Sequence, residues 1–118
     1  MKKYNYSKGK QGEDEARKHL VDKGFGYIES NFEIESGEID LIMSDKDTLV
    51  FVEVKFKSDD SMGIPEEMIN RRKVAQVKRI AEIYLIRNPN IRSLFARYRI
   101  DAVCILGNKI RHYQNIYA

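Results

Sequence analysis

A largely apolar stretch extends from Leu49 to Phe56, with the sequence Leu-Val-Phe-Val-Glu-Val-Lys-Phe. β-branched and aromatic residues dominate it, which is typical of a β-strand. Because apolar residues occupy both alternating positions, we expect a central strand covered on two faces. Glu53 and Lys55 are two residues apart and therefore share one face. Burying two charges costs several kcal/mol each unless they are paired or bind a ligand. The alternatives to a functional site are mutual neutralisation and a solvated sheet edge.

Two strands are predicted before this one, over residues 25–32 and 38–43, joined as an antiparallel hairpin. Alternation along the second strand places Glu38, Asp40 and Ile42 on one face. The other face then holds Ile39, Leu41 and Met43. Asp40 therefore interrupts an apolar segment, where a carboxylate without a partner is costly.

A first helix is predicted over residues 8–23, with Ala16 and Leu20 on its buried stripe. Glu13 lies three residues before Ala16, a spacing that places both side chains on the inward face. The alternative for Glu13 is a first-turn carboxylate that the helix dipole favours. Both interpretations follow from the residues alone.

The second half of the chain begins with a polar loop over residues 57–65 and a helix over about 66–87. The apolar stripe expected on that helix consists of Ile69, Val77, Ile80, Ala81 and Tyr84. Lys73 interrupts this stripe and so points inward or along the edge of a groove. Strands over 97–106 and 109–117 follow, joined at Gly107-Asn108. The isolated acid Asp101 in the first of them is expected to pair with Arg99 or a neighbouring strand.

The order helix, three strands, helix, two strands predicts an α/β fold: a mixed central sheet flanked by helices, in a single domain covering residues 1–118. With 42% hydrophobic and 33% charged residues, the composition is that of a soluble globular domain. A net charge of +3 is compatible with a polyanionic partner without requiring one. No secretory signal or membrane span is recognisable, so we expect a cytoplasmic protein without membrane contact.

The cysteine and histidine content argues against two further kinds of site. Cys104 is the single cysteine, which excludes an intramolecular disulfide, and we expect it in the core of a strand. Neither histidine has a Cys or His neighbour at zinc-ligand spacing, so a structural zinc is not expected.

The acids suggest a different chemistry. If Asp40 and Glu53 face each other across adjacent strands, their carboxylates can hold one hard cation such as Mg²⁺ or Mn²⁺. A nearby ammonium such as that of Lys55 can orient or help deprotonate an attacking water, or stabilise charge on a phosphate. These groups suit phosphodiester hydrolysis. They do not suit acyl transfer, because no Ser or Cys nucleophile with a His partner is evident.

Asp40, twelve intervening residues and then Glu53-Val54-Lys55 resemble the motif of the PD-(D/E)xK nuclease superfamily, which includes restriction endonucleases and archaeal Holliday-junction resolvases. A closer resemblance is to the YraN family of small bacterial proteins. It is carried by four segments in order: Gly12-Glu13, residues 37–42, residues 51–55, and Gly63-x-Pro65-Glu66 with Lys73. The resemblance extends from about Gly9 to Asp101.

The resemblance implies a restriction-endonuclease-like fold and a metal-dependent endonuclease. In that superfamily the acids matching Asp40 and Glu53 ligate the metal, usually with the backbone carbonyl at Val54. The lysine matching Lys55 assists the attacking water, and a helical glutamate matching Glu13 completes or orients the site.

Three further residues are candidates for supporting the site or contacting substrate: Glu38, Lys57 and Lys73. Glu38 shares a face with Asp40. The family tends to place Thr-Arg after the lysine, whereas this chain has Phe56-Lys57. Because a lysine lacks the bidentate fork of arginine, Lys57 is not an equivalent phosphate clamp.

The expected partner is nucleic acid, in particular DNA of branched or abnormal structure, by analogy with the resolvases. The same analogy allows a homodimer. The alternative function is a binding module for nucleic acid or protein that keeps the nuclease fold without appreciable catalysis. A structural ion network without a ligand is a third interpretation.

Overall fold

The computed structural model describes residues 8–117. Its elements are α1 Lys8–Asp22, β1 Gly26–Ile34, β2 Gly37–Asp45, β3 Thr48–Lys57, the 3-10 helix η2 Pro65–Met68, α2 Arg71–Arg87, α3 Pro89–Arg92, β4 Arg97–Leu106 and β5 Lys109–Tyr113. This confirms the expected mixed α/β fold and its order of one helix, three strands, one helix and two strands, with the short helices η2 and α3 added. No helix within residues 8–117 is long and apolar enough to cross a lipid bilayer.

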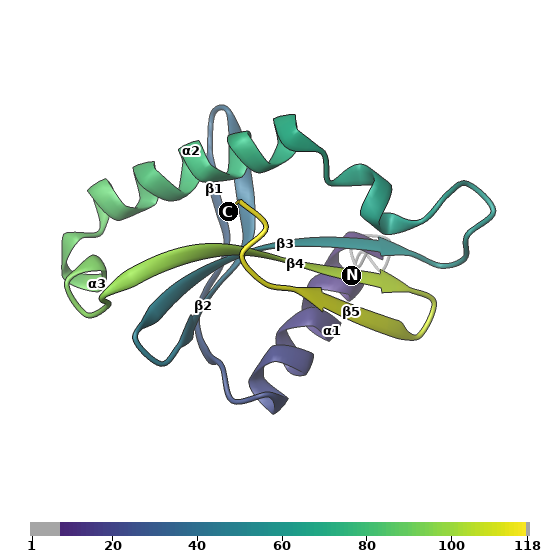
Figure 1. Cartoon of the computed structure of the whole chain (residues 1–118), viewed down its shortest axis with the longest axis horizontal. Helices are drawn as coiled ribbons and strands as arrows, with labels where there is room; N and C mark the ends of the chain where they lie inside the picture. The colour runs from purple at the N-terminus through teal and green to yellow at the C-terminus, as the bar shows by residue number, and fades with distance from the viewer. Residues whose placement is uncertain (1–7, 118) are drawn as a thin grey trace, which may run out of the picture.

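The five strands form one sheet in the order β1-β2-β3-β4-β5, so β3 is the central strand. β3 and β4 are parallel, and the other three pairs are antiparallel. Parallel neighbours need a crossover connection, which α2 supplies between β3 and β4. Figure 1 shows α1 and α2 on opposite sides of the sheet.

The sheet therefore has a core layer on each face. Val50, Val52 and Val54 of β3 pack on the α1 side, in a cluster that includes Ala16 and Leu20 of that helix. The alternate residues Leu49 and Phe51 pack on the α2 side, together with five buried residues of that helix: Val77, Ile80, Ala81, Tyr84 and Leu85. A central strand buried on both faces is confirmed, and any charged residue on it must find a partner.

The predicted helix over residues 66–87 is interrupted, which corrects the sequence-based boundary. Asn70 caps the N-terminus of α2 by accepting a hydrogen bond from the Lys73 backbone N–H at 2.9 Å. Ile69 has a non-helical backbone (φ −108°, ψ 88°) and lies outside the buried stripe expected of it. An asparagine side chain competes with helix hydrogen bonding and so favours a cap over a helix interior. The residues before the break form η2.

The predicted strand over residues 109–117 ends at Tyr113, because the chain turns at Asn115, which has a positive φ of 57°. The Asn115 backbone N–H donates to Asp101 at 2.9 Å, and the next N–H, of Ile116, donates to the carbonyl oxygen of Ile100 at 2.8 Å. The C-terminal segment is therefore fixed against β4. Positive φ is uncommon except in glycine, asparagine and aspartate, which explains why the strand stops here.

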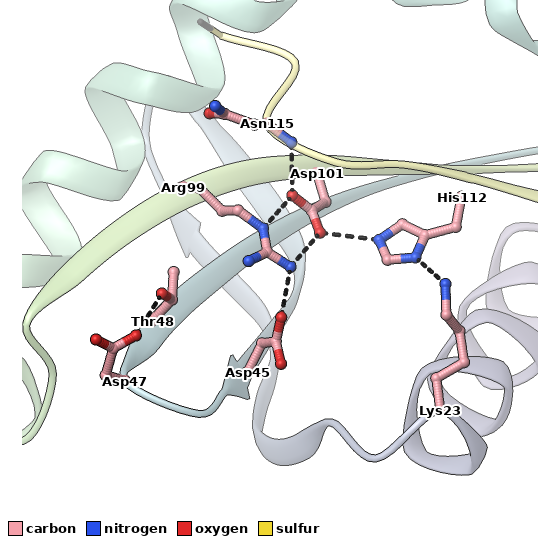
Figure 2. Close-up of polar contacts among 8 residues, drawn as sticks. All are labelled: Lys23, Asp45, Asp47, Thr48, Arg99, Asp101, His112 and Asn115. Atoms are coloured by element: carbon pink, nitrogen blue, oxygen red, sulfur yellow. Dashed lines mark hydrogen bonds and ion pairs between the residues drawn. The ribbon is translucent and has the colours of Figure 1, made fainter.

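Asp101 is fully buried and accepts hydrogen bonds from three elements (Figure 2). Arg99 Nε donates at 2.9 Å, His112 Nε2 lies at 2.8 Å and the third donor is the Asn115 N–H. The sequence predicts a partner in Arg99 or in a neighbouring strand, and the structure shows both, Arg99 and His112 of β5. Burial acts to raise the pKa of Asp101, but the hydrogen bonds of His112, Arg99 and Asn115 outweigh it and lower that pKa.

Figure 2 also shows that the contacts around Asp101 extend to Lys23, just after α1, and to Asp45, the last residue of β2. Lys23 Nζ lies 2.8 Å from His112 Nδ1, and Arg99 Nη2 lies 3.1 Å from Asp45 Oδ2. A neutral His112 that donates from Nε2 and accepts at Nδ1 satisfies both of its contacts. We call Asp101, Arg99 and His112 the buried Asp101 network.

α1 approaches the sheet closely at Gly12. A Cβ atom on Gly12 would lie 2.9 Å from Cβ of Phe56 on β3. Contacts under 3.0 Å force a shift of the backbone or of the neighbouring residue. Gly12 therefore sets the depth at which the following residue, Glu13, meets the sheet.

We expect Gly12→Ala to lower the free energy of unfolding by about 1–3 kcal/mol, because the added methyl group overpacks the α1–β3 contact. Urea unfolding followed by circular dichroism measures this. Gly9→Ala is the matched control, since Gly9 is exposed in the same helix and the same change there is expected to be neutral or to stabilise by up to about 1 kcal/mol. Equal effects of the two substitutions would contradict the close approach.

Candidate active site

The site is built where β2 and β3 separate. Their ladder pairs Leu41 with Val52 and continues to Asp45 and Thr48 at the hairpin end. Beyond it, the backbone N–H of Val54 donates to Asp40 Oδ2 at 2.8 Å. Because a strand's N–H lies in the plane of the sheet, this bond holds the Asp40 carboxylate between the two strands.

A local distortion makes this position possible. Ile39 packs with Ile42 on the α2 side, whereas Leu41 packs on the α1 side. The expectation that Ile39 and Leu41 share one face is therefore wrong, because the alternation of β2 is broken at Asp40. Opposite Asp40, Asn31 of β1 has a positive φ of 55°.

Three carboxylates meet on the α1 side of this gap. Glu13 of α1 and Glu38 and Asp40 of β2 each place one carboxylate oxygen within 4.8 Å of the others. We call these three residues the acidic cluster. Asn31 Nδ2 donates to Glu13 Oε1 at 2.9 Å and to Glu38 Oε2 at 3.2 Å, and so holds two of the acids in place.

The electrostatics of the cluster favour uptake of positive charge. Burial, with the negative charge of Glu53 as the next cause, raises the pKa of Asp40 to about 8, and Glu13 and Glu38 add to this effect. Burial also raises the pKa of Glu13, against the hydrogen bond from Asn31. A proton on Asp40 relieves the repulsion among these acids, and a cation would relieve it as well.

The α2 side of the gap holds an ion triad, Glu53 with Lys55 and Lys73. Glu53 is only 2% exposed, and its Oε2 lies 3.3 Å from Lys55 Nζ and 3.5 Å from Lys73 Nζ. Lys73 therefore points inward from α2, as its position in the apolar stripe predicts. The ion triad neutralises Glu53 inside the protein.

The structure thus distributes the expected site residues over two groups. Asp40 lies at the junction, the acidic cluster adds Glu13 and Glu38, and Glu53 belongs to the ion triad. Val54 contributes its N–H to Asp40. Lys57 donates to the backbone carbonyl of Met62 at 2.9 Å and so ties down the loop after β3.

Two features differ from the sequence-based picture. Glu13 lies beyond the first turn of α1 as described, so the first-turn interpretation does not apply. Asn31 was not identified as a site residue. The sequence offers one signal, an asparagine within an otherwise extended segment, because asparagine tolerates a positive φ. This signal indicates a distorted strand, but it does not identify the side chains that the amide contacts.

Comparison with known protein families matches residues 12–105 to the group described as "Uncharacterised protein family UPF0102". The chain belongs to this family. UPF0102 is the YraN family, so the resemblance found in the motifs is confirmed. The matched region begins at Gly12-Glu13 and ends on β4, and it therefore contains both the acidic cluster and the ion triad.

Curated UPF0102 proteins match nearly the whole chain. The relative from Persephonella marina is 37% identical over 114 residues, which cover 97% of this chain and 96% of the relative. The relative from Vibrio campbellii is 38% identical over 110 residues, covering 91% and 88%. The relative from Clostridioides difficile is 34% identical over 113 residues, covering 96% and 98%.

The raised pKa of Asp40 makes the stability of this UPF0102 protein depend on pH. Between the unfolded value of 3.8 and the folded value of about 8, the native state holds a proton that the unfolded state releases. The stability that this proton provides is therefore complete below pH 3.8 and is lost as the pH rises through 8. One proton corresponds to a slope of up to about 1.4 kcal/mol per pH unit.

We expect Asp40→Asn, in the presence of EDTA, to remove most of the decrease in the free energy of unfolding with rising pH, because asparagine does not titrate. The free energy of unfolding from urea titrations at several pH values between 4 and 8 measures it. Glu35→Gln, at an exposed position in the β1–β2 turn, is the control and should keep the wild-type slope. A wild-type slope in Asp40→Asn would show that Asp40 is ionised throughout this range.

Proposed function

We propose that this protein is a metal-dependent nuclease that hydrolyses phosphodiester bonds in DNA. The observation that supports the proposal best is the position of Asp40 in the gap between β2 and β3. The acidic cluster lies on one side of it and the lysine-bearing ion triad on the other. Carboxylates that hold a cation and ammonium groups that meet a phosphate are the two requirements of this hydrolysis.

The donor set fits a hard divalent cation, Mg²⁺ or Mn²⁺. All three acids of the cluster offer oxygen ligands, and burial, together with repulsion from neighbouring carboxylates, raises the pKa of Glu13 and Asp40. Asp40, with Glu13 and Glu38, would hold the ion, and Glu53 and the Val54 carbonyl are the further ligands that the family resemblance implies. When bound, the ion supplies Lewis-acid chemistry, which acidifies water and neutralises charge on the phosphate.

The lysines have the remaining roles. Lys55 is partly exposed, with 23% of its side chain accessible, and so can meet a water or a phosphate oxygen while Glu53 fixes its position. Lys73 contacts the same carboxylate from α2 and leaves 28% of its side chain accessible. Two ammonium groups beside one buried carboxylate leave a local excess of positive charge, which favours an anionic substrate.

Substrate and assembly follow as parts of the same proposal. A net charge of +3 is modest for a small domain that binds a DNA duplex as a monomer. We therefore favour a homodimer that holds branched or otherwise abnormal DNA. A nuclease-fold binding module without catalysis is the competing proposal, and it is favoured by the neutralisation of Glu53 within the protein.

We expect wild-type protein with Mn²⁺ to cleave branched or flapped DNA, and Asp40→Asn, Glu53→Gln and Lys55→Ala each to lose at least about 100-fold in rate. The losses follow from removing a cation ligand, a buried counter-charge and a group that assists the water. Gel assays on labelled oligonucleotides, with a chelator as blank, measure the rates. Circular dichroism checks that each variant is folded.

Glu35→Gln is the matched control, since it removes one exposed carboxylate that belongs neither to the acidic cluster nor to the ion triad. It should retain the wild-type rate. DNA binding without metal-dependent cleavage of any substrate would favour the binding module. Full activity in Asp40→Asn would remove the acidic cluster from the mechanism.

A further inference from the structure

A cavity of about 650 Å³ lies beside the ion triad on the α2 side of the sheet. Its lining includes Ala102 and Cys104 of β4, Asn70 and Val74 near the start of α2, and Tyr113 at the end of β5. Register connects the cavity to the proposed site. On the parallel pair β3–β4, Glu53 is level with Ala102 and Lys55 with Cys104. Residues that are level on adjacent strands project from the same face.

Two local features form the walls of the cavity: the helix break before α2 and the turn at Asn115. The break at Ile69 and Asn70 separates η2 from α2, and Glu66 of η2 reaches over to β5. Its carboxylate accepts hydrogen bonds from Arg111 Nε at 2.6 Å and from the Tyr113 hydroxyl at 2.7 Å. This contact holds one wall of the cavity in place.

The turn at Asn115 builds another wall. After it, Ile116 and Tyr117 line the cavity, anchored through the buried Asp101 network and the Ile116–Ile100 backbone hydrogen bond. Lys78 Nζ lies 4.6 Å from the centroid of the Tyr117 ring. Tyr117 remains 49% exposed as a residue, so it is accessible to a ligand.

The chemistry of the lining indicates what the cavity accepts. It combines two tyrosine rings, Tyr113 and Tyr117, with apolar side chains, with Arg71 at the first position of α2 and with the carboxylate of Glu66, which is paired with Arg111. Lys73, two residues further along α2, reaches Glu53 of the ion triad. An aromatic and apolar cavity with cations on its border is complementary to a flat base carried on a phosphate backbone. Its volume lies within the range of small-ligand sites.

We propose that this cavity binds an unpaired nucleobase of the substrate strand, next to the phosphate that the ion triad contacts. The inference rests on the proposed function, and it specifies the substrate as DNA with an unstacked base at the site. A base within an intact duplex would first have to be unstacked and unpaired, which costs a few kcal/mol. Discrimination between unpaired and paired DNA follows from this cost.

The test uses short duplexes carrying 2-aminopurine, either paired with thymine or unpaired in a single-base bulge. Binding is followed by 2-aminopurine fluorescence at one fixed salt concentration, with EDTA present so that cleavage cannot occur. We expect wild-type protein to bind the bulged duplex at least about tenfold more tightly and to quench its fluorescence, because a stacked base contributes about that much or more.

Two variants test the cavity from opposite walls. Tyr117→Ala removes a stacking ring, and Val74→Phe fills the cavity from α2. Each should reduce the preference for the bulged duplex to about threefold or less. Tyr27→Ala is the matched control, because Tyr27 is an exposed tyrosine of β1 that lies outside the cavity lining. It should keep the wild-type preference. Circular dichroism verifies folding of all three.

Equal affinity of the wild type for the two duplexes, including failure to bind either, would overturn the inference. A preference that survives in both cavity variants would overturn it as well. These results are separate from a failure of the proposed nuclease function. In that case the bulged duplex would still bind preferentially through Tyr117 and Val74, but no substrate would be cleaved when Mn²⁺ is added.

Discussion

The hydrogen bond from the Val54 N–H to Asp40 is the interaction on which the rest of the candidate site depends. It takes the place of a backbone contact between β2 and β3 and so holds a carboxylate where the sheet opens. A buried N–H that lost this acceptor would be unsatisfied, at a cost of about 1–3 kcal/mol. The hydrogen bond that completes the sheet therefore also fixes Asp40, which lies between the acidic cluster and the ion triad.

The surrounding structure supports this opening from both faces. On the α1 side, the close contact at Gly12 brings Glu13 to the gap, and Asn31 holds Glu13 beside Glu38. On the α2 side, Glu53 holds two lysines at a single carboxylate. On β4 and β5, the buried Asp101 network fixes the chain after β5 and with it one wall of the cavity. The site and the cavity are thus built on ordered strands and helices.

Much of the fold was predictable from the sequence, because strong local patterns determine it. The apolar run of β3 predicts a strand buried on two faces, and the strand over residues 97–106 has the boundaries of β4. Glu13 and Lys73 could be oriented inward by helical spacing alone. The Asp101–Arg99 pair was foreseeable, because a buried acid needs a nearby cation and the two residues share a strand face.

The parts that could not be predicted depend on contacts between distant segments. Asn31 adopts a left-handed conformation within a strand, and only the folded structure shows that its amide bridges two acids. The alternation of β2 also breaks at Asp40, so the strict period of two does not hold along this strand. The helix break at Asn70 combines a local cap with the Glu66–Arg111 contact, which lies 45 residues apart in sequence.

The proposed nuclease function requires that the acidic cluster around Asp40 hold a divalent cation. Calorimetric titration of Mn²⁺ into the wild type, Asp40→Asn and Glu35→Gln tests it without any assumption about substrate. We expect the wild type and Glu35→Gln to bind Mn²⁺ saturably and Asp40→Asn to lose this binding. Because phosphate oxygens often complete such a site, the titration is repeated with short DNA. Absence of Mn²⁺ binding by the wild type under both conditions, or equal binding by Asp40→Asn, would contradict a cation site at the acidic cluster.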